Sequence, residues 1–263
     1  MGDDDFALAA ELVVDAGRLA AQMLAGGLTS HRKTTVSDIV TAADHDAEKL
    51  IVGRLRAERP EDGIVGEEGT NDASTGADAR TWFVDPVDGT YNFAAGLSPW
   101  CAALALRHGG PPDPGDAGGL ILGAVYEPVT ELLSVGGPGR VTTVNGAAVT
   151  PLTDRPLTHC SLATYLHPTT LTDDGVRNPL LRVWTGAATV RMLGSGSVEL
   201  AAIAGGRLGA YVQTDCLDWD WLPGAALVEA AGGATSVFDH NGHRWHVAGN
   251  GQVVEEIVGL LRR

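Results

Sequence analysis

Two aspartates follow a short apolar run in the segment 82–90, which reads WFVDPVDGT. Asp85 and Asp88 come where the run ends, so their carboxylates can converge on a hard cation, which prefers oxygen ligands. The Val87 carbonyl can point the same way, and the Gly-Thr pair that follows can open a helix whose N–H groups bind an anion. Asp-Pro-x-Asp-Gly is also good turn chemistry, so this segment alone leaves a plain turn and a cation–anion site both open.

Two further acidic pairs lie among apolar residues. Glu67 and Glu68 follow the run Ile-Val-Gly, and Asp218 and Asp220 alternate with two tryptophans. Carboxylates in such surroundings are costly to bury unless they bind a cation or are paired, and few Lys or Arg residues stand nearby in the sequence. The three acidic clusters together therefore favour a shared cation site over three unrelated turns.

In their order along the chain, these motifs resemble the inositol monophosphatase family. The resemblance is carried by Gly66-Glu67-Glu68, by Asp85-Pro86-Val87-Asp88-Gly89-Thr90, and by Trp219-Asp220 with Gly224 and Ala230-Ala231-Gly232-Gly233. It extends to Lys33, to Asp38–Asp44, to Gly194-Ser195 and to Gly205–Tyr211, and so spans nearly the whole chain.

The resemblance implies an α+β fold, the layered α/β/α/β/α sandwich of the inositol monophosphatase and fructose-1,6-bisphosphatase type. It also implies a lithium-sensitive, homodimeric phosphatase with two or three Mg²⁺ ions per site. By motif position, Glu67, Asp85 and the Val87 carbonyl would hold one ion, Asp85, Asp88 and Asp220 a second, and Glu67 would also reach a third. Two metal ions in such a site supply a nucleophile near neutral pH and stabilise the leaving alkoxide.

The other roles implied by the resemblance belong to catalysis and to substrate binding. Thr90 beside Glu67 would orient the attacking water, which makes Glu67, Thr90 and the bridging Asp85 the catalytic set. Gly89, Thr90 and Ser195 would lie close to the phosphate, and Gln213 and Asp220 would face the rest of the substrate.

The metal motifs indicate a small phosphate monoester and leave its alcohol open. Inositol monophosphate is the first expectation, although Gln213 stands where inositol phosphatases carry an acidic residue. Histidinol phosphate and 3′-phosphorylated adenosine nucleotides are alternatives, and Asp215 or Asp218 could serve the cationic amine of histidinol phosphate. A regulatory scaffold is the non-enzymatic alternative, but a scaffold would not need the full set of acidic ligands.

Two other features invite a functional interpretation. His240, His243 and His246 recur every third residue, but Asn241-Gly242 is a strong hairpin turn that would separate them, which argues against a zinc site. Glu199 follows Ser195 on an expected helix and is interpreted as an ordinary helix-start carboxylate.

The helices and strands that position these residues are predicted from the spacing of apolar residues and from the glycines and prolines that end such elements. Helices are predicted over 6–26, over about 41–58, over 195–204 and over 223–231, the last with Pro223 in its first turn, where a missing N–H costs nothing. Strands are predicted over 81–84, 101–106, 120–126, 132–135 and 210–213, and exposed loops over 70–79 and 109–119. A boundary near 145–156 would separate an N-terminal subdomain, 1–148, with most metal ligands from a C-terminal subdomain, 149–263, with Asp220 and the substrate contacts.

The composition of the chain limits the classes of partner that it can bind and indicates its cellular compartment. The chain has 263 residues, and 33 acidic against 18 basic residues give a formal net charge of −15, with no Lys/Arg cluster of the kind that nucleic acid rewards. The three cysteines lack metal or disulfide spacing and indicate reduced thiols, and the acidic N-terminus is unlike a signal peptide, so a cytoplasmic protein is expected. No apolar run approaches the roughly 20 residues of a membrane span.

Overall fold

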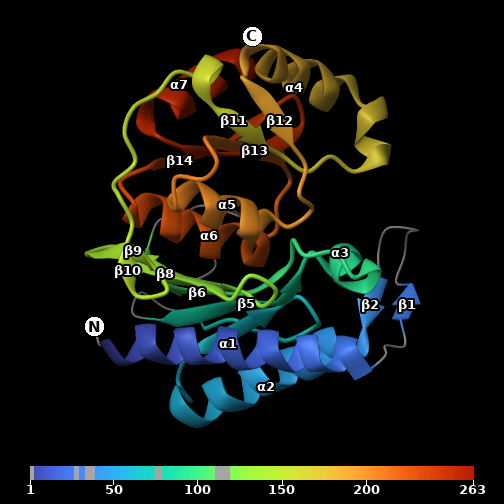
Figure 1. Cartoon of the computed structure of the whole chain (residues 1–263), viewed down its shortest axis with the longest axis vertical. Helices are drawn as coiled ribbons and strands as arrows, with labels where there is room; N and C mark the ends of the chain where they lie inside the picture. The colour runs from blue at the N-terminus through green and yellow to red at the C-terminus, as the bar shows by residue number, and fades with distance from the viewer. Residues whose placement is uncertain (1–2, 27–29, 33–38, 75–78, 110–118) are drawn as a thin grey trace.

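The computed structural model describes residues 3–26, 30–32, 39–74, 79–109 and 119–263. Figure 1 shows five layers stacked along the long axis of the molecule. Two helices cover one face of an eight-stranded sheet, two more helices lie between that sheet and a five-stranded sheet, and a last pair covers the far side. The predicted α/β/α/β/α sandwich is therefore confirmed.

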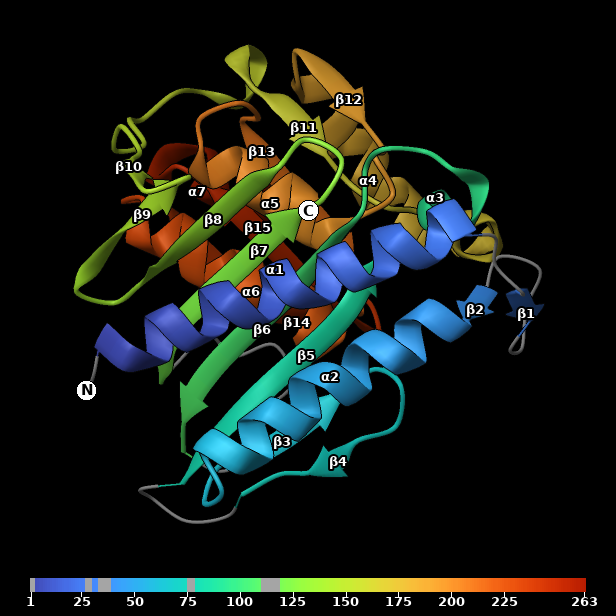
Figure 2. The ribbon, with the colours of Figure 1, turned by 60° about the horizontal axis from the view of Figure 1, so that its bottom comes forward.

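The outer helices of the first half are α1 (Asp3–Gly26) and α2 (Ala42–Glu58), which end where the sequence predicted. Ala9, Leu12, Val13 and Ala16 recur at helical spacing on α1 and are fully buried. Both helices lie across the same face of the large sheet, as Figure 2 shows. Their apolar stripes and that face of the sheet form one hydrophobic cluster.

The eight-stranded sheet has the order β10-β9-β8-β7-β6-β5-β3-β4. Its strands are β3 (Gly63–Gly66), β4 (Asn71–Asp72), β5 (Arg80–Asp88), β6 (Cys101–His108), β7 (Leu120–Glu127), β8 (Leu132–Gly137), β9 (Arg140–Val144) and β10 (Ala147–Ala148). The predicted strands of this half are confirmed; the short β4 lies inside the predicted loop 70–79, and most of the predicted loop 109–119 lies outside the described residues. The register of β5 against β6 shifts between Asp85 and Asp88, and such an irregularity turns side chains out of a regular strand. Beside this sheet, β1 (Ser30–Arg32) pairs with β2 (Ile39–Thr41), and α3 (Thr90–Ala95) follows β5.

The five-stranded sheet has the order β12-β11-β13-β15-β14. Its elements are β11 (Ser161–Ala163), β12 (Thr189–Arg191), β13 (Ala210–Thr214), β14 (Ala234–His240) and β15 (His243–Gly249), with α4 (Asp174–Gly186) and α7 (Gly251–Leu261) on its outer face and the 3₁₀ turns η1 (Leu157–His159) and η2 (Pro168–Thr172) in its connections. Asn241, with a φ of 54°, and Gly242 form the predicted hairpin turn between β14 and β15.

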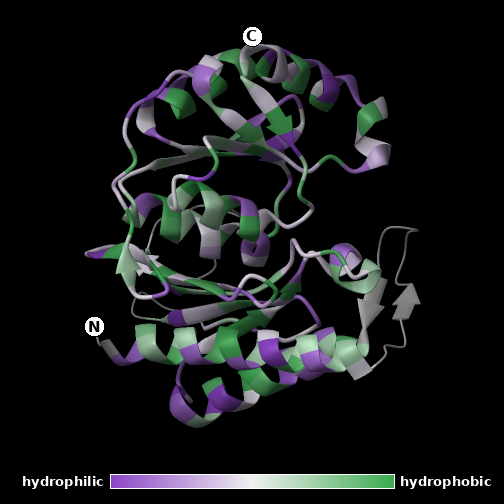
Figure 3. Ribbon diagram, viewed as in Figure 1, coloured by the Kyte–Doolittle hydropathy of each residue, from purple (hydrophilic) through white to green (hydrophobic). Residues whose placement is uncertain are grey.

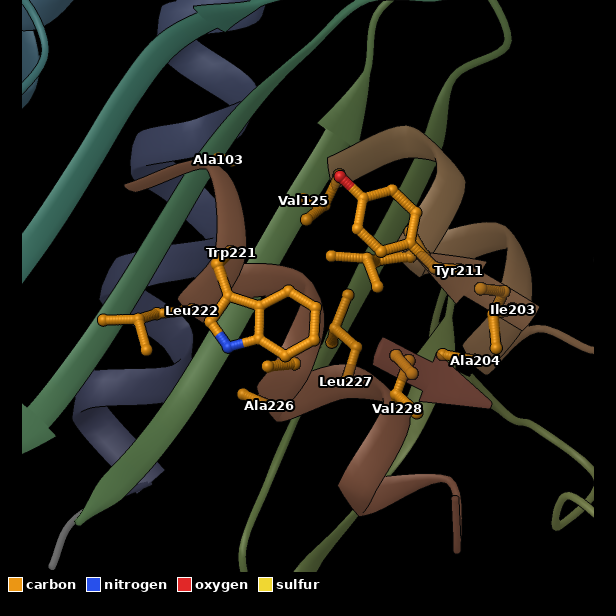
Figure 4. Packing of buried hydrophobic residues seen from close by; sticks show 14 of the residues in the cluster. Ala103, Val125, Ile203, Ala204, Tyr211, Trp221, Leu222, Ala226, Leu227 and Val228 are labelled. Atoms are coloured by element: carbon orange, nitrogen blue, oxygen red, sulfur yellow. The ribbon is translucent and has the colours of Figure 1, made fainter. Parts of the chain in front are cut away.

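The middle layer consists of α5 (Gly196–Ala204) and α6 (Asp218–Ala230). Figure 3 shows their many hydrophobic residues between the two sheets. Figure 4 shows Trp221, Leu222 and Leu227 of α6 in the cluster that also takes in Ala103 and Val125 of the large sheet and Tyr211 of β13. These two helices therefore join both sheets into one hydrophobic core.

The prediction that Pro223 lies in the first turn of its helix is wrong. The helix begins at Asp218, with Asp218 and Asp220 in the first turn, where acidic side chains complement the helix dipole. Pro223 therefore lies inside α6 and removes one internal hydrogen bond. The helix persists because it is held by packing: a Cβ at Gly123 of β7 would lie 2.1 Å from the Pro223 oxygen, so helix and sheet approach as closely as a glycine allows.

The two predicted subdomains correspond to the two sheets, since β10 ends at Ala148 and the next strand belongs to the five-stranded sheet. Because α5 and α6 share one core with both sheets, the boundary at 148 stays a prediction. Within the described ranges, no helix combines the length and the apolar character that crossing a membrane requires.

Candidate active site

Four acidic side chains from three elements face one another at the end of β5. Asp85 interacts with the charges of Glu67, Asp88 and Asp220, and it shares a hydrogen bond with Asp220. Glu67 follows β3, Asp85 and Asp88 end β5, and Asp220 lies in the first turn of α6. The structure thus brings together the four acidic side chains that the sequence proposed as metal ligands.

Burial and mutual repulsion both act on this cluster. Burial first, and then the charges of Glu67, Asp88 and Asp220, raise the pKa of Asp85 well above its usual range. Burial and the charge of Asp88 raise the pKa of Asp220 to about 7. Burial also raises the pKa of Asp88, although the Ser197 backbone N–H opposes this by donating to Asp88 Oδ2 at 2.6 Å.

The donor set fits a divalent, oxygen-loving cation. Among the described residues, none of Asp85, Asp88 and Asp220 forms an ion pair with a Lys, Arg or His side chain, and a bound cation would supply the missing charge. Across those residues, no three His, Cys, Asp or Glu side chains already stand at metal-ligand spacing. The carboxylates would therefore have to turn from each other toward an ion.

Hydrogen bonds and one close glycine contact define the backbone that follows β5. The Val87 N–H donates to Asp85 Oδ1 at 3.1 Å, and the Thr90 hydroxyl donates to the Val87 carbonyl at 3.0 Å. Gly89 has a φ of 94°, which favours glycine, and a Cβ there would lie 3.2 Å from both the Gly194 oxygen and the Ser195 Cβ. Ser195 caps α5 by accepting from the Val198 N–H at 3.3 Å, so the starts of α3 and α5 meet at Gly89.

Gln213 lies on β13, partly exposed, with its side-chain oxygen accepting the Tyr211 hydroxyl. The Tyr211 hydroxyl itself is buried and also contacts the Cys216 sulfur. Because the side-chain oxygen of Gln213 accepts this hydrogen bond, the Nε2 group is the part of the amide that can donate to a ligand.

Two residues that hold the site were not recognised from the sequence. Asn92 of α3 donates to the Leu193 carbonyl at 2.7 Å, across 101 residues of chain, and no spacing pattern could indicate that contact. Glu199 was interpreted as an ordinary helix-start carboxylate; it is in the first turn of α5, but it is fully buried and accepts the Leu193 N–H at 2.6 Å. Burial raises the pKa of Glu199 to about 8, although the Leu193 N–H opposes the shift.

The three spaced histidines have separate environments. His243 lies 2.7 Å from Asp215 and 3.0 Å from Asp173, and these carboxylates raise its pKa. His246 is buried against Trp221, and burial lowers its pKa to about 4. Of the other motif residues, Asp44 is buried in α2, while Lys33 and Asp38 lie outside the described residues.

Comparison with known proteins agrees with this arrangement. The model of the inositol monophosphatase family matches residues 3–259. The chain is 31% identical to inositol-1-monophosphatase of Mycobacterium leprae, over 90% of this chain and 80% of the relative. It is 30% identical to the Nus factor SuhB of Escherichia coli K12, over 86% of this chain and 83% of the relative.

A solved structure extends the likeness to the fold. The extragenic suppressor protein SuhB of Bartonella henselae superposes with a TM-score of 0.85 and covers 99% of both chains, at 24% identity. Since the family match runs over nearly the whole length, the resemblance noted in the motifs is confirmed, and the chain belongs to the inositol monophosphatase family.

Proposed function

We propose that the chain is a Mg²⁺-dependent phosphomonoesterase that acts on a small phosphorylated metabolite. Inositol monophosphate is the first candidate for this substrate. The observation that carries the proposal is the meeting of four acidic side chains, from the loop after β3, from β5 and from α6, beside the Gly89–Gly194 contact. Cations and a phosphate monoester would there share one small volume between the end of β5 and the starts of α3, α5 and α6.

In this proposal, Glu67, Asp85 and the Val87 carbonyl hold one Mg²⁺ ion, Asp85, Asp88 and Asp220 hold a second, and Glu67 reaches a third. When bound, these ions make a nucleophile available near neutral pH and neutralise charge on the leaving oxygen. Thr90, fixed through its hydrogen bond to the Val87 carbonyl, orients the attacking water beside Glu67. Gly89, Thr90 and Ser195 bind the phosphate, and Asp220 and Gln213 contact the leaving alcohol.

The deciding experiment is phosphate release from a panel of monoesters, with Mg²⁺ and with a chelator. The panel contains inositol monophosphate, histidinol phosphate and 3′-phosphoadenosine nucleotides. Release from at least one substrate, abolished by the chelator, is expected. If no member of the panel releases phosphate at millimolar Mg²⁺, the scaffold alternative is favoured. That alternative is kept because some relatives are named Nus factor SuhB. A homodimer and a cytoplasmic location also belong to the proposal, and sedimentation and cell fractionation test them.

Gln213→Glu is expected to improve kcat/KM for inositol monophosphate several-fold. A carboxylate can keep the Tyr211 hydroxyl on one oxygen and offer the other to a substrate hydroxyl. The gain from one such charge-assisted bond is roughly 1 kcal/mol. An adenosine bisphosphate should be hydrolysed less efficiently, because its anionic groups approach a new charge.

Gln252→Glu is the matched control, since it adds the same charge at an exposed position on α7. This substitution should leave kcat/KM unchanged for both inositol monophosphate and the adenosine bisphosphate. Equal effects of Gln213→Glu on both substrates would show that the residue does not contact the alcohol.

Li⁺ is expected to inhibit the reaction, with K⁺ as the control. The resemblance implies that Li⁺ can replace the ion held by Asp88 and Asp220 and stall turnover. Initial rates are measured over a series of millimolar LiCl and KCl at fixed Mg²⁺. Identical rates in the two salts would count against this assignment.

A further inference from the structure

Gly89 is enclosed by backbone from two distant parts of the chain. A Cβ at this position would lie 2.9 Å from the Pro99 oxygen and 3.2 Å from the Gly194 oxygen. Both neighbouring segments must therefore keep their positions if the backbone of Gly89 and Thr90 is to present its two N–H groups to a phosphate.

One side chain connects these two segments. Asn92, only 9% exposed, donates from Nδ2 to the Pro99 carbonyl at 2.7 Å and to the Leu193 carbonyl at 2.7 Å. A Cβ at Gly194 would lie 2.9 Å from the same Nδ2 atom, so Asn92 packs directly on the segment that follows Leu193. Since Asn92 belongs to α3, it joins the helix that starts at Gly89 to the β12–α5 connection.

The other polar group of Leu193 is also held by a side chain. Its N–H donates to Glu199 Oε1 at 2.6 Å, and Glu199 is completely buried. Both backbone polar groups of Leu193 are therefore bound by buried side chains, one from α3 and one from α5. Two residues later, Ser195 caps α5, and the Ser197 backbone N–H donates to Asp88.

We propose that Asn92 and Glu199 are positioning residues of the phosphate site, which fix Leu193 and so hold Gly194 and Ser195 against Gly89. This rests on the proposed function, because it assumes that phosphate binds between these segments. Neither side chain needs to touch substrate. Each acts through the backbone that it holds, as supporting residues act on metal ligands.

The test uses the full chain and three substitutions. Glu199→Met removes the acceptor, Asn92→Ser removes the amide group that donates to both carbonyls, and Glu199→Gln keeps an acceptor oxygen for Leu193. Asn145→Ala is the matched control, because Asn145 also binds backbone twice, at Leu133 N and Glu131 O, in the β9–β10 turn. Inorganic phosphate is the probe, and its inhibition constant is measured for each variant. KM, kcat and the half-saturating Mg²⁺ concentration are measured in the same assays. Amide hydrogen exchange is measured for the peptide that contains Leu193.

Glu199→Met and Asn92→Ser should speed exchange at Leu193 and raise both the phosphate inhibition constant and KM roughly tenfold. Half-saturating Mg²⁺ should stay within about twofold of the wild-type value. Glu199→Gln should restore slow exchange and tight phosphate binding, and Asn145→Ala should alter only Tm.

Faster exchange with an unchanged phosphate inhibition constant would overturn the proposal, because the two side chains would then only stabilise the fold. Equal losses in Glu199→Gln and Glu199→Met would overturn it too, since the hydrogen bond would not be the cause. Failure of the proposed function looks different: the wild-type protein would then hydrolyse no monoester and bind no inorganic phosphate, while Leu193 exchange would still respond to the substitutions.

Discussion

Replacing Asp85 with asparagine is expected to lower kcat/KM by about three orders of magnitude or more, equivalent to about 4 kcal/mol of transition-state stabilisation. Asp85 is the carboxylate on which Glu67, Asp88 and Asp220 all act, and it is the proposed bridge between two ions. An amide at this position removes one negatively charged ligand that both ions would share. The measurement is phosphate release at saturating Mg²⁺, where weak ion binding alone can be overcome.

The fold should survive this substitution, which separates a catalytic loss from a structural one. Asp85 lies buried among other acids, where the neutral form is favoured, so an uncharged asparagine suits this position and the metal-free Tm should not fall. Asp239→Asn is the control, an identical exchange at an exposed residue whose partner is Arg244. Retention of more than about a tenth of wild-type turnover by Asp85→Asn would show the two-ion assignment to be wrong.

Without metal, the protein is expected to lose stability as the pH rises from about 4 to 7. The pKa of Asp220 is raised from 3.8 to about 7 in the folded protein, so the folded state binds a proton over this interval that the unfolded state has released. The free energy of unfolding therefore falls with rising pH, by about 4 kcal/mol for this one group. Asp85 and Asp88, whose pKa values are also raised, act in the same direction.

Mg²⁺ should reverse this loss, and it should do so mainly above pH 7. Ligand carboxylates must be ionised to bind, so the rise in Tm caused by Mg²⁺ should be large at pH 8 and small at pH 5. Thermal unfolding with chelator and with Mg²⁺ at the two pH values measures the effect. In Asp220→Asn the metal-free dependence on pH should flatten, and an equal Mg²⁺ effect at both pH values in the wild type would contradict the assignment.

Local sequence patterns predicted much of the fold, because the features concerned depend on neighbours along the chain. Apolar spacing predicted α1 from its first turn to Gly26, and the Asn241-Gly242 pair predicted its hairpin. The motifs identified the family, and their acidic residues meet in space as expected. Their roles as metal ligands stay predictions.

What the sequence did not show depends on distant contacts. Proline at 223 argued for a helix start, but close packing of α6 on Gly123 holds the helix on both sides of it. Glu199 was interpreted as an ordinary helix-start carboxylate because its burial depends on the layers around α5, which no local pattern shows. The bonds of Asn92 reach a carbonyl that no local pattern could assign to it.

The middle layer has a consequence for how the chain is made. Phe83, Ala103 and Val125 on the inner face of the large sheet are covered by α5 and α6, which are encoded well after that sheet. At about 5–20 residues per second, the ribosome needs on the order of ten seconds to pass from β10 to the end of α6. Until α6 has been made, these apolar residues lack the helices that cover them, and exposed apolar surface of this kind is bound by chaperones and drives aggregation when translation stalls.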